Sequence, residues 1–306
     1  MKSIIIDCDT GNDDAVAIIF ALANDLNVIG ITTVGGNVTV DSCTLNTLKI
    51  LELIGKNVPV YQGEQQPLSR KLTVLQEGLM GADDDLPAPI TSPKPISATD
   101  FLRETFKEPS DTSILAIAPM TNIAKSQIRV AEITMMGGCP FPEPTKNRMG
   151  NMQNGIAEYN SWADPEAFKA VAANTKMINM IGLNITQSVM YNYRHEEKLR
   201  AINTKISNKV ADLLSVLCDN DKRDFAHLCS FPNDPVRGMH DVVAAAYMVD
   251  RSIFKSELLP IEIGENGETR IIRNGVSSAT LMNVITDIDR EKFFDLFYSS
   301  ITRYQP

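Results

Sequence analysis

The stretch Ile4-Ile5-Ile6-Asp7-Cys8-Asp9-Thr10-Gly11-Asn12-Asp13-Asp14 decides the fold of this chain. Its three isoleucines form a short β-branched run, which is typical of a buried strand, and the segment 13–23 that follows has the pattern of a helix. The four aspartates therefore lie on a loop at the carboxyl end of a strand. In open α/β sheets this is the edge at which ligands bind.

Four carboxylates this close together cost free energy unless protons or a cation neutralise them. One interpretation is a solvated acidic turn that caps the following helix. The other is an all-oxygen site for a hard divalent cation, Ca²⁺ or Mg²⁺, because these ions prefer carboxylate and carbonyl ligands. We favour the cation site because the acids directly follow a buried strand.

The composition is that of a soluble globular enzyme. Hydrophobic residues make up 43% of the 306 residues and charged residues 22%. The net charge of −9 argues against nucleic acid or an anionic membrane surface as a partner, because both attract basic patches. The sequence has no apolar run long enough for a membrane span and no signal-peptide pattern, so we expect a cytoplasmic protein. The five cysteines form no Cys-x-x-Cys pair, which favours reduced thiols and disfavours zinc.

Strand-like and helix-like segments alternate along the first two-thirds of the chain. We expect strands at 28–34, 58–61, 113–118, 133–136 and 177–181, and helices at 43–54, 121–127 and 164–173. We expect a long loop near the site at residues 65–95 and helices within residues 191–237. Near the end of the chain we expect strands at 259–263, 268–272 and 279–286, followed by a final helix from residue 290. This pattern predicts one α/β domain over residues 1–306, with an open, mostly parallel sheet flanked by helices on both faces.

Polar residues follow several of the expected strands. If the sheet is parallel, they share one edge with the aspartate loop. Each has an ordinary explanation as a turn or cap residue, and for Asn122 we expect a helix cap. Together they predict a pocket of carboxylates and amides that suits a polyhydroxylated ligand such as a sugar. The residues are Asn37, Asn122, Asn151, Asn154, Glu158, Asn160, His240 and Asp241.

Six motifs of the chain resemble those of the inosine-uridine preferring nucleoside hydrolase family, whose first motif is Asp-x-Asp-x-Gly-x-Asp-Asp after a strand. In chain order they read IIIDCDTGNDDAVAI, VGGNVTV, APMTNIA, MMGG, AEYNSWADPEA and GMHDVVAAAY. The resemblance covers nearly the whole chain. It implies a Rossmann-like core, calcium-dependent hydrolysis of ribonucleosides to ribose and free base in nucleoside salvage, and assembly as a homodimer or homotetramer.

The resemblance also implies a role for each member of the aspartate loop. Calcium would be held by the carboxylates of Asp7, Asp9, Asp14 and Asp241 and by the backbone carbonyl of Ile117. Since a bound cation lowers the pKa of its water, Asp9 is expected to act as the general base on that water.

The expected substrate contacts follow in the same way. The resemblance places Asp13, Asn37, Glu158 and Asn160 on ribose hydroxyls and Met136 as an apolar contact. The motif around residue 150 is one residue longer than in the family, so either Asn151 or Asn154 takes the remaining ribose contact. We favour Asn151 because it keeps the preceding glycine. His240 is the candidate to protonate or orient the leaving base, because the pKa of an imidazole lies near neutrality.

The sequence does not decide which nucleobase the substrate carries. Many family members carry a His-Gly pair after the third strand, but the matching stretch 74–81 has no histidine, and His227 is the other histidine that could reach the base. Purine-specific members stack the base between tryptophans. The single tryptophan here, Trp162, is expected to serve packing and not base stacking, so we expect a broad or a pyrimidine- and inosine-tolerant specificity.

Two alternatives compete with this interpretation. One is a calcium-dependent nucleoside- or sugar-binding protein without turnover, against which the retained Asp9 argues. The other is a haloacid-dehalogenase-like phosphatase, which also has Asp-x-Asp after its first strand. That pattern requires Thr or Val two residues beyond the second aspartate, where this chain has Gly11, and it leaves Asp13 and Asp14 without a role.

Overall fold

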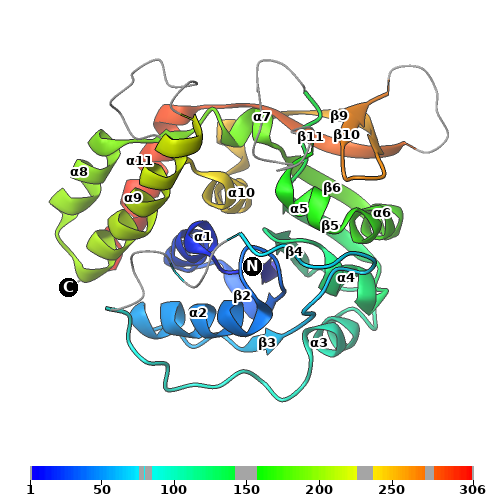
Figure 1. Cartoon of the computed structure of the whole chain (residues 1–306), viewed down its shortest axis with the longest axis horizontal. Helices are drawn as coiled ribbons and strands as arrows, with labels where there is room; N and C mark the ends of the chain where they lie inside the picture. The colour runs from blue at the N-terminus through cyan, green and yellow to red at the C-terminus, as the bar shows by residue number, and fades with distance from the viewer. Residues whose placement is uncertain are drawn as a thin grey trace.

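A nine-stranded sheet in the order β10-β9-β11-β6-β5-β4-β1-β2-β3 runs through the molecule (Figure 1). The structure is a computed structural model that describes residues 2–75, 79, 85–141, 157–225, 237–272 and 279–304, without the side chains of 217–225 and 237. The strands are β1 (Ser3–Cys8), β2 (Asn27–Thr33), β3 (Val60–Gln62), β4 (Ser113–Ala116), β5 (Val130–Met136), β6 (Thr175–Ile181), β9 (Phe254–Ile263), β10 (Thr269–Ile271) and β11 (Thr280–Ile288).

The sheet is mostly parallel, as the alternation of segments predicts. Strands β3, β2, β1, β4, β5, β6 and β11 pair in parallel, whereas β9 is antiparallel to both β11 and β10. The α/β fold class is therefore confirmed. Strand β9 begins five residues before the expected range 259–263, at Phe254. Its first half is largely exposed and carries Lys255 and Glu257, so it lacks the apolar signal of a buried strand.

Helices cover both faces of the sheet (Figure 1). One core joins the sheet to α1 (Asn12–Ala23), α2 (Val40–Leu53), α9 (Lys205–Phe225), α10 (His240–Val249) and α11 (Arg290–Ile301). The other core joins it to α3 (Ala98–Thr105), α4 (Thr121–Ser126) and α6 (Pro165–Asn174). Along β1, Ile4 and Ile6 face the first core and Ile5 faces the second, because successive side chains of a strand alternate between faces.

Helix α1 has no exposed face, because all twelve of its residues are buried. It packs against α10, α9, α11 and α2. Burying every side of the helix fixes its position relative to the sheet. The aspartate loop that leads into α1 is therefore held at both ends, by β1 and by this helix.

The segment 191–237 is only partly as expected. Helices α8 (Tyr193–Ile202) and α9 agree with the prediction, but a two-stranded sheet of β7 (Met190–Tyr191) and β8 (Arg237–Gly238) borders them. Strands of two residues are too short to leave a pattern in the sequence. His227 lies outside the described residues. Within the described ranges, no helix combines the length and apolarity that a membrane crossing needs.

Candidate functional site

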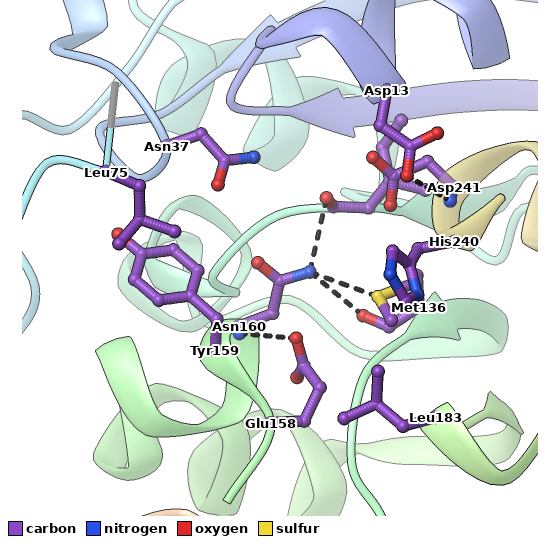
Figure 2. Close-up of a pocket in the computed structure, with 11 residues that line it drawn as sticks. Asp13, Asn37, Leu75, Met136, Glu158, Tyr159, Asn160, Leu183, His240 and Asp241 are labelled. Atoms are coloured by element: carbon purple, nitrogen blue, oxygen red, sulfur yellow. Dashed lines mark hydrogen bonds between the residues drawn. The ribbon is translucent and has the colours of Figure 1, made fainter. Parts of the chain in front are cut away.

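A pocket opens at the sheet edge where β1, β2, β4 and β5 end (Figure 2). It is lined by Asp13, Asn37, Leu75, Ile117, Met136, Glu158, Tyr159, Asn160, Leu183, His240 and Asp241. Eight of these residues were expected there from the sequence. The buried carboxylates of Asp7, Asp9 and Asp14 belong to the same loop, whereas Asn151 and Asn154 lie outside the described residues.

The turn after β2 holds the carboxylate of Asp9. The backbone N–H of Asn37 donates to Asp9 Oδ2 at 2.5 Å, and the Asn37 side-chain amide donates to Oδ1 at 3.2 Å. Gly36 makes this contact possible, since a Cβ at that position would lie only 1.9 Å from Asp9 Oδ2. Asp14 fixes the other side of the loop, because its carboxylate accepts the backbone N–H groups of Asp9 and Gly11 at 3.1 and 3.2 Å.

Asp7 is oriented by two donors on one oxygen. Its Oδ1 accepts Thr32 Oγ1 at 2.6 Å and Asn122 Nδ2 at 2.8 Å. Its Oδ2 is buried and has no hydrogen-bond partner among the described residues. A buried oxygen without a donor is costly in a protein interior, and a cation would satisfy it.

The prediction that Asn122 caps a helix is wrong. The N-cap of α4 is Met120, and Asn122 lies inside the helix. Its side chain points to the sheet, where Nδ2 also donates to Thr33 O at 3.0 Å and Oδ1 accepts the N–H of Glu64 at 2.9 Å. Asn122 is therefore a residue that positions Asp7, which the sequence did not reveal.

The buried carboxylates are hard to keep ionised without a counter-charge. Burial raises the pKa of Asp7 to about 6. Burial and the neighbouring charge of Asp13 raise the pKa of Asp14 to about 7. Burial and the charge of Asp14 raise the pKa of Asp9 well above its ordinary value. In the described part of the chain, no three His, Cys, Asp or Glu side chains already converge as a metal-binding group. The donor set is nevertheless one that a hard cation fits, since it consists of carboxylates with one orphaned oxygen.

Glu158 and Asn160 are set by the short helix α5 (Tyr159–Ala163). Glu158 is its N-cap, and its carboxylate accepts the N–H groups of Asn160, Ser161 and Gly138 at 2.8 to 3.2 Å. Burial raises the pKa of Glu158 despite these bonds. The Asn160 amide donates to the backbone carbonyls of Ile117 at 3.3 Å and Met136 at 3.2 Å, across the ends of β4 and β5 (Figure 2).

Helix α10 brings the far end of the chain to the aspartate loop. The N–H of Asp241 donates to Asp13 Oδ2 at 3.2 Å, although the two residues are 228 positions apart. His240, one residue earlier, lines the same pocket, and its Nδ1 lies 2.7 Å from Thr186 Oγ1. The structure thus joins residues that the sequence placed on one sheet edge.

The sequence did not identify the apolar wall of the pocket. This wall consists of Leu75, Tyr159 and Leu183. Leu75 belongs to the described part of the expected loop 65–95, and two hydrogen bonds hold it: Leu75 N–H to Asn37 O at 3.0 Å and Tyr159 O–H to Thr73 O at 2.6 Å. Tyr159 could have been predicted as a pocket residue, because in the sequence it lies between Glu158 and Asn160, which are both expected to contact ribose. Leu75 and Leu183 have no such neighbours in the sequence. Trp162 lies outside the pocket lining and packs at a tilt on Tyr159.

Comparisons with known proteins give consistent matches over nearly the whole chain. The family model described as inosine-uridine preferring nucleoside hydrolase matches residues 4–295. The pyrimidine-specific ribonucleoside hydrolase RihA of Shewanella sp. (strain MR-4) is 31% identical over 330 residues, covering 100% of this chain and 98% of the relative. RihA of Citrobacter koseri is 29% identical over 323 residues, with 98% of each chain covered. Among solved structures, the purine-preferring ribonucleoside hydrolase from Gardnerella vaginalis superposes with a TM-score of 0.82 at 26% identity, over 98% of each chain.

Proposed function

The chain belongs to the inosine-uridine preferring nucleoside hydrolase family, and on that premise we propose that its pocket cleaves pyrimidine ribonucleosides with the help of a bound calcium ion. As a ribonucleoside hydrolase it is an N-glycosidase. The phosphatase alternative does not fit this membership.

The buried aspartate loop carries the calcium proposal. Three carboxylates are fully buried at one sheet edge, and the Oδ2 atom of Asp7 has no donor among the described residues. We assign the ion to Asp7, Asp9, Asp14 and Asp241 with the carbonyl of Ile117. Calcium accepts six to eight oxygens, so room remains for water and sugar hydroxyls. When bound, the ion would lower the pKa of its water and neutralise the loop.

The chain's own residues do the remaining work. Breaking an N-glycosidic bond builds positive charge on the ribose, which nearby carboxylates stabilise. Asp9 takes a proton from the attacking water. The ribose is held by Asp13, Asn37, Glu158, Asn160 and, by the proposal, Asn151 or Asn154, with Met136 beneath it. Such an array positions the sugar for attack.

The leaving base would lie between His240 and the apolar wall of Leu75, Tyr159 and Leu183. A ring nitrogen of His240 can donate to the base as it departs. Relatives at 31% identity are pyrimidine-specific, so we expect uridine and cytidine to be cleaved faster than inosine and adenosine. We also expect a homo-oligomer acting in cytoplasmic nucleoside salvage, for which light scattering on the purified protein tests the assembly.

One assay tests the proposal. The protein is incubated with uridine, cytidine, inosine and adenosine, with calcium or with EDTA, and reducing ribose is measured. We expect ribose from the pyrimidine nucleosides in calcium and little in EDTA. Release of ribose from none of the four would refute hydrolysis, and equal rates in EDTA would refute the calcium requirement. Asp9→Ala should still bind ribose but lose most turnover; full activity would remove Asp9 from the role of base.

A further inference from the structure

The imidazole of His240 is held by a residue outside the pocket lining. Its Nδ1 lies 2.7 Å from the hydroxyl of Thr186, which is fully buried at the end of α7 (Leu183–Thr186). Thr186 does not line the pocket and does not belong to any of the motifs considered above. Its hydroxyl is therefore placed to act on the substrate only through His240.

A second contact restricts the ring. A Cβ on Gly238 would lie 2.8 Å from His240 Cε1, 3.0 Å from Nε2 and 3.3 Å from Thr186 O. The backbone of Gly238 thus lies against the Cε1–Nε2 edge of the imidazole, close to the Thr186 carbonyl, and leaves no room there for a side chain.

The small sheet of β7 and β8 holds both contacts in place. Gly238 pairs with Met190, and the N–H of Met239 donates to Val189 O at 3.1 Å. The segment that leads into α10 is thereby tied to the segment that follows α7. The paired backbone at Gly238 and the hydroxyl of Thr186 together limit rotation of the imidazole.

We propose that Thr186 is a positioning residue that donates its hydroxyl hydrogen to His240 Nδ1 and so places the proton of the neutral ring on Nε2. This inference rests on the proposed function. When the C–N bond breaks, its electron pair collects on the base, and an Nε2–H can donate a hydrogen bond to the base atom that gains charge. The opposite tautomer would turn a lone pair toward an electron-rich group, which is unfavourable. The partner of one imidazole nitrogen decides which nitrogen carries the proton.

Two matched variants test the role of the hydroxyl. Thr186→Val keeps the shape of the side chain and loses the donor, whereas Thr186→Ser keeps the donor. For Thr186→Val we expect kcat on the preferred nucleoside to fall roughly 10- to 100-fold, by analogy with the loss seen when the partner that orients a metal-bound histidine is removed. KM should change by less than about threefold, because the residue does not touch the ribose. Thr186→Ser should recover most of kcat.

A spectroscopic readout tests the contact without any turnover. The chain has three histidines, His195, His227 and His240, so long-range ¹H–¹⁵N spectra of the imidazoles stay simple, and the His240 signals are those lost in His240→Gln. We expect the Nε2–H tautomer in the wild type and in Thr186→Ser, and a mixture of tautomers in Thr186→Val. Melting temperatures of all variants check that they are folded.

The outcomes separate the two proposals. An Nδ1–H tautomer in the wild type, or unchanged spectra and kcat in Thr186→Val, would overturn the role of Thr186. If the wild type shows the expected tautomer but releases no ribose from any nucleoside, the proposed function fails while the contact stands. A Gly238→Ala variant should disturb the His240 signals with Thr186 intact, and unaltered signals would contradict the described restriction of the ring.

Discussion

Replacing Asn122 with alanine tests whether the aspartate loop is built for a cation. The substitution removes three hydrogen bonds: those from Nδ2 to Asp7 Oδ1 and to Thr33 O, and that from the Glu64 N–H to Oδ1. Asn122 is fully buried, so water does not readily replace these partners. Asp7 keeps only Thr32 as a side-chain donor.

The size of the effect follows from the kind of each bond. A neutral hydrogen bond contributes about 1 kcal/mol and one to a charged group about 1.5–3 kcal/mol, so the free energy of unfolding should fall by roughly 3–5 kcal/mol. At an unfolding entropy of about 2.1 cal/mol/K per residue, a chain of 306 residues should lose roughly 5–8 °C in melting temperature.

The variant should also bind calcium more weakly. The bond from Asn122 lowers the pKa of Asp7, which burial raises to about 6. Without that bond the pKa rises further, and more of Asp7 is protonated at pH 7. Since the ion binds the carboxylate and not the acid, the loss of affinity should shrink as the pH is raised toward 9.

The assay is thermal unfolding with calcium and with EDTA, at pH 7 and pH 9. Asn24→Ala is a matched control, because Asn24 donates to Phe20 O and Ser300 Oγ at 2.8 Å each but lies at the opposite end of α1. It should lose about 2 kcal/mol and keep the full stabilisation by calcium. The reasoning is refuted if Asn122→Ala loses less than about 1 kcal/mol, or if calcium stabilises it as much as the wild type.

Three further predictions concern the pocket and the pH dependence of stability. Tyr159→Phe removes only the hydrogen bond to Thr73 O. Because such a bond contributes about 1 kcal/mol, KM should rise roughly 3- to 10-fold while kcat stays nearly unchanged. An unaltered KM in steady-state assays would count against a role of this bond in holding the apolar wall of the pocket. Gly36→Ala places a methyl group against Asp9 Oδ2. The rate of ribose release should fall more than about 100-fold, as for loss of a general base. Near-normal activity would show that the aspartate loop can move away from the new methyl group. Burial lowers the pKa of His195 to about 4, so the unfolded chain takes up this proton near pH 6.5 and the folded chain only near pH 4. The free energy of unfolding should therefore decrease as the pH is lowered from 6.5 to about 4. The decrease should be less steep in His195→Gln. If the urea midpoint changes with pH equally in the variant and the wild type, the prediction is wrong.

The sheet and the side of it that carries the site could be predicted because both depend on local pattern. A β-branched run such as Ile4–Ile6 followed by polar residues indicates a strand and its end. Parallel pairing then places such ends together, which is why Asp13 and Asn37 meet in the structure. The roles assigned to these residues stay predictions until the assays above are made.

Features that depend on tertiary contacts could not be predicted. Asparagine is equally suited to cap a helix or to bond a distant carboxylate, and only the position of Asp7 across the sheet decides for Asn122. Leu183 resembles any core leucine until the strand ends are assembled around it. Strands β7 and β8 are too short for periodicity, although they hold the histidine that faces the pocket.

The burial of α1 has a consequence for protein synthesis. The ribosome synthesises β1 and α1 well before α10 and α11, which pack against α1. Until these helices are made, apolar surface of α1 that is buried in the folded protein stays exposed to water. Exposed apolar surface on a nascent chain promotes aggregation. We expect fragments that stop before α10 to be insoluble or bound by chaperones. Because Asp13 of the aspartate loop and His240 and Asp241 of α10 line the same pocket, the pocket can form only after α10 has been synthesised.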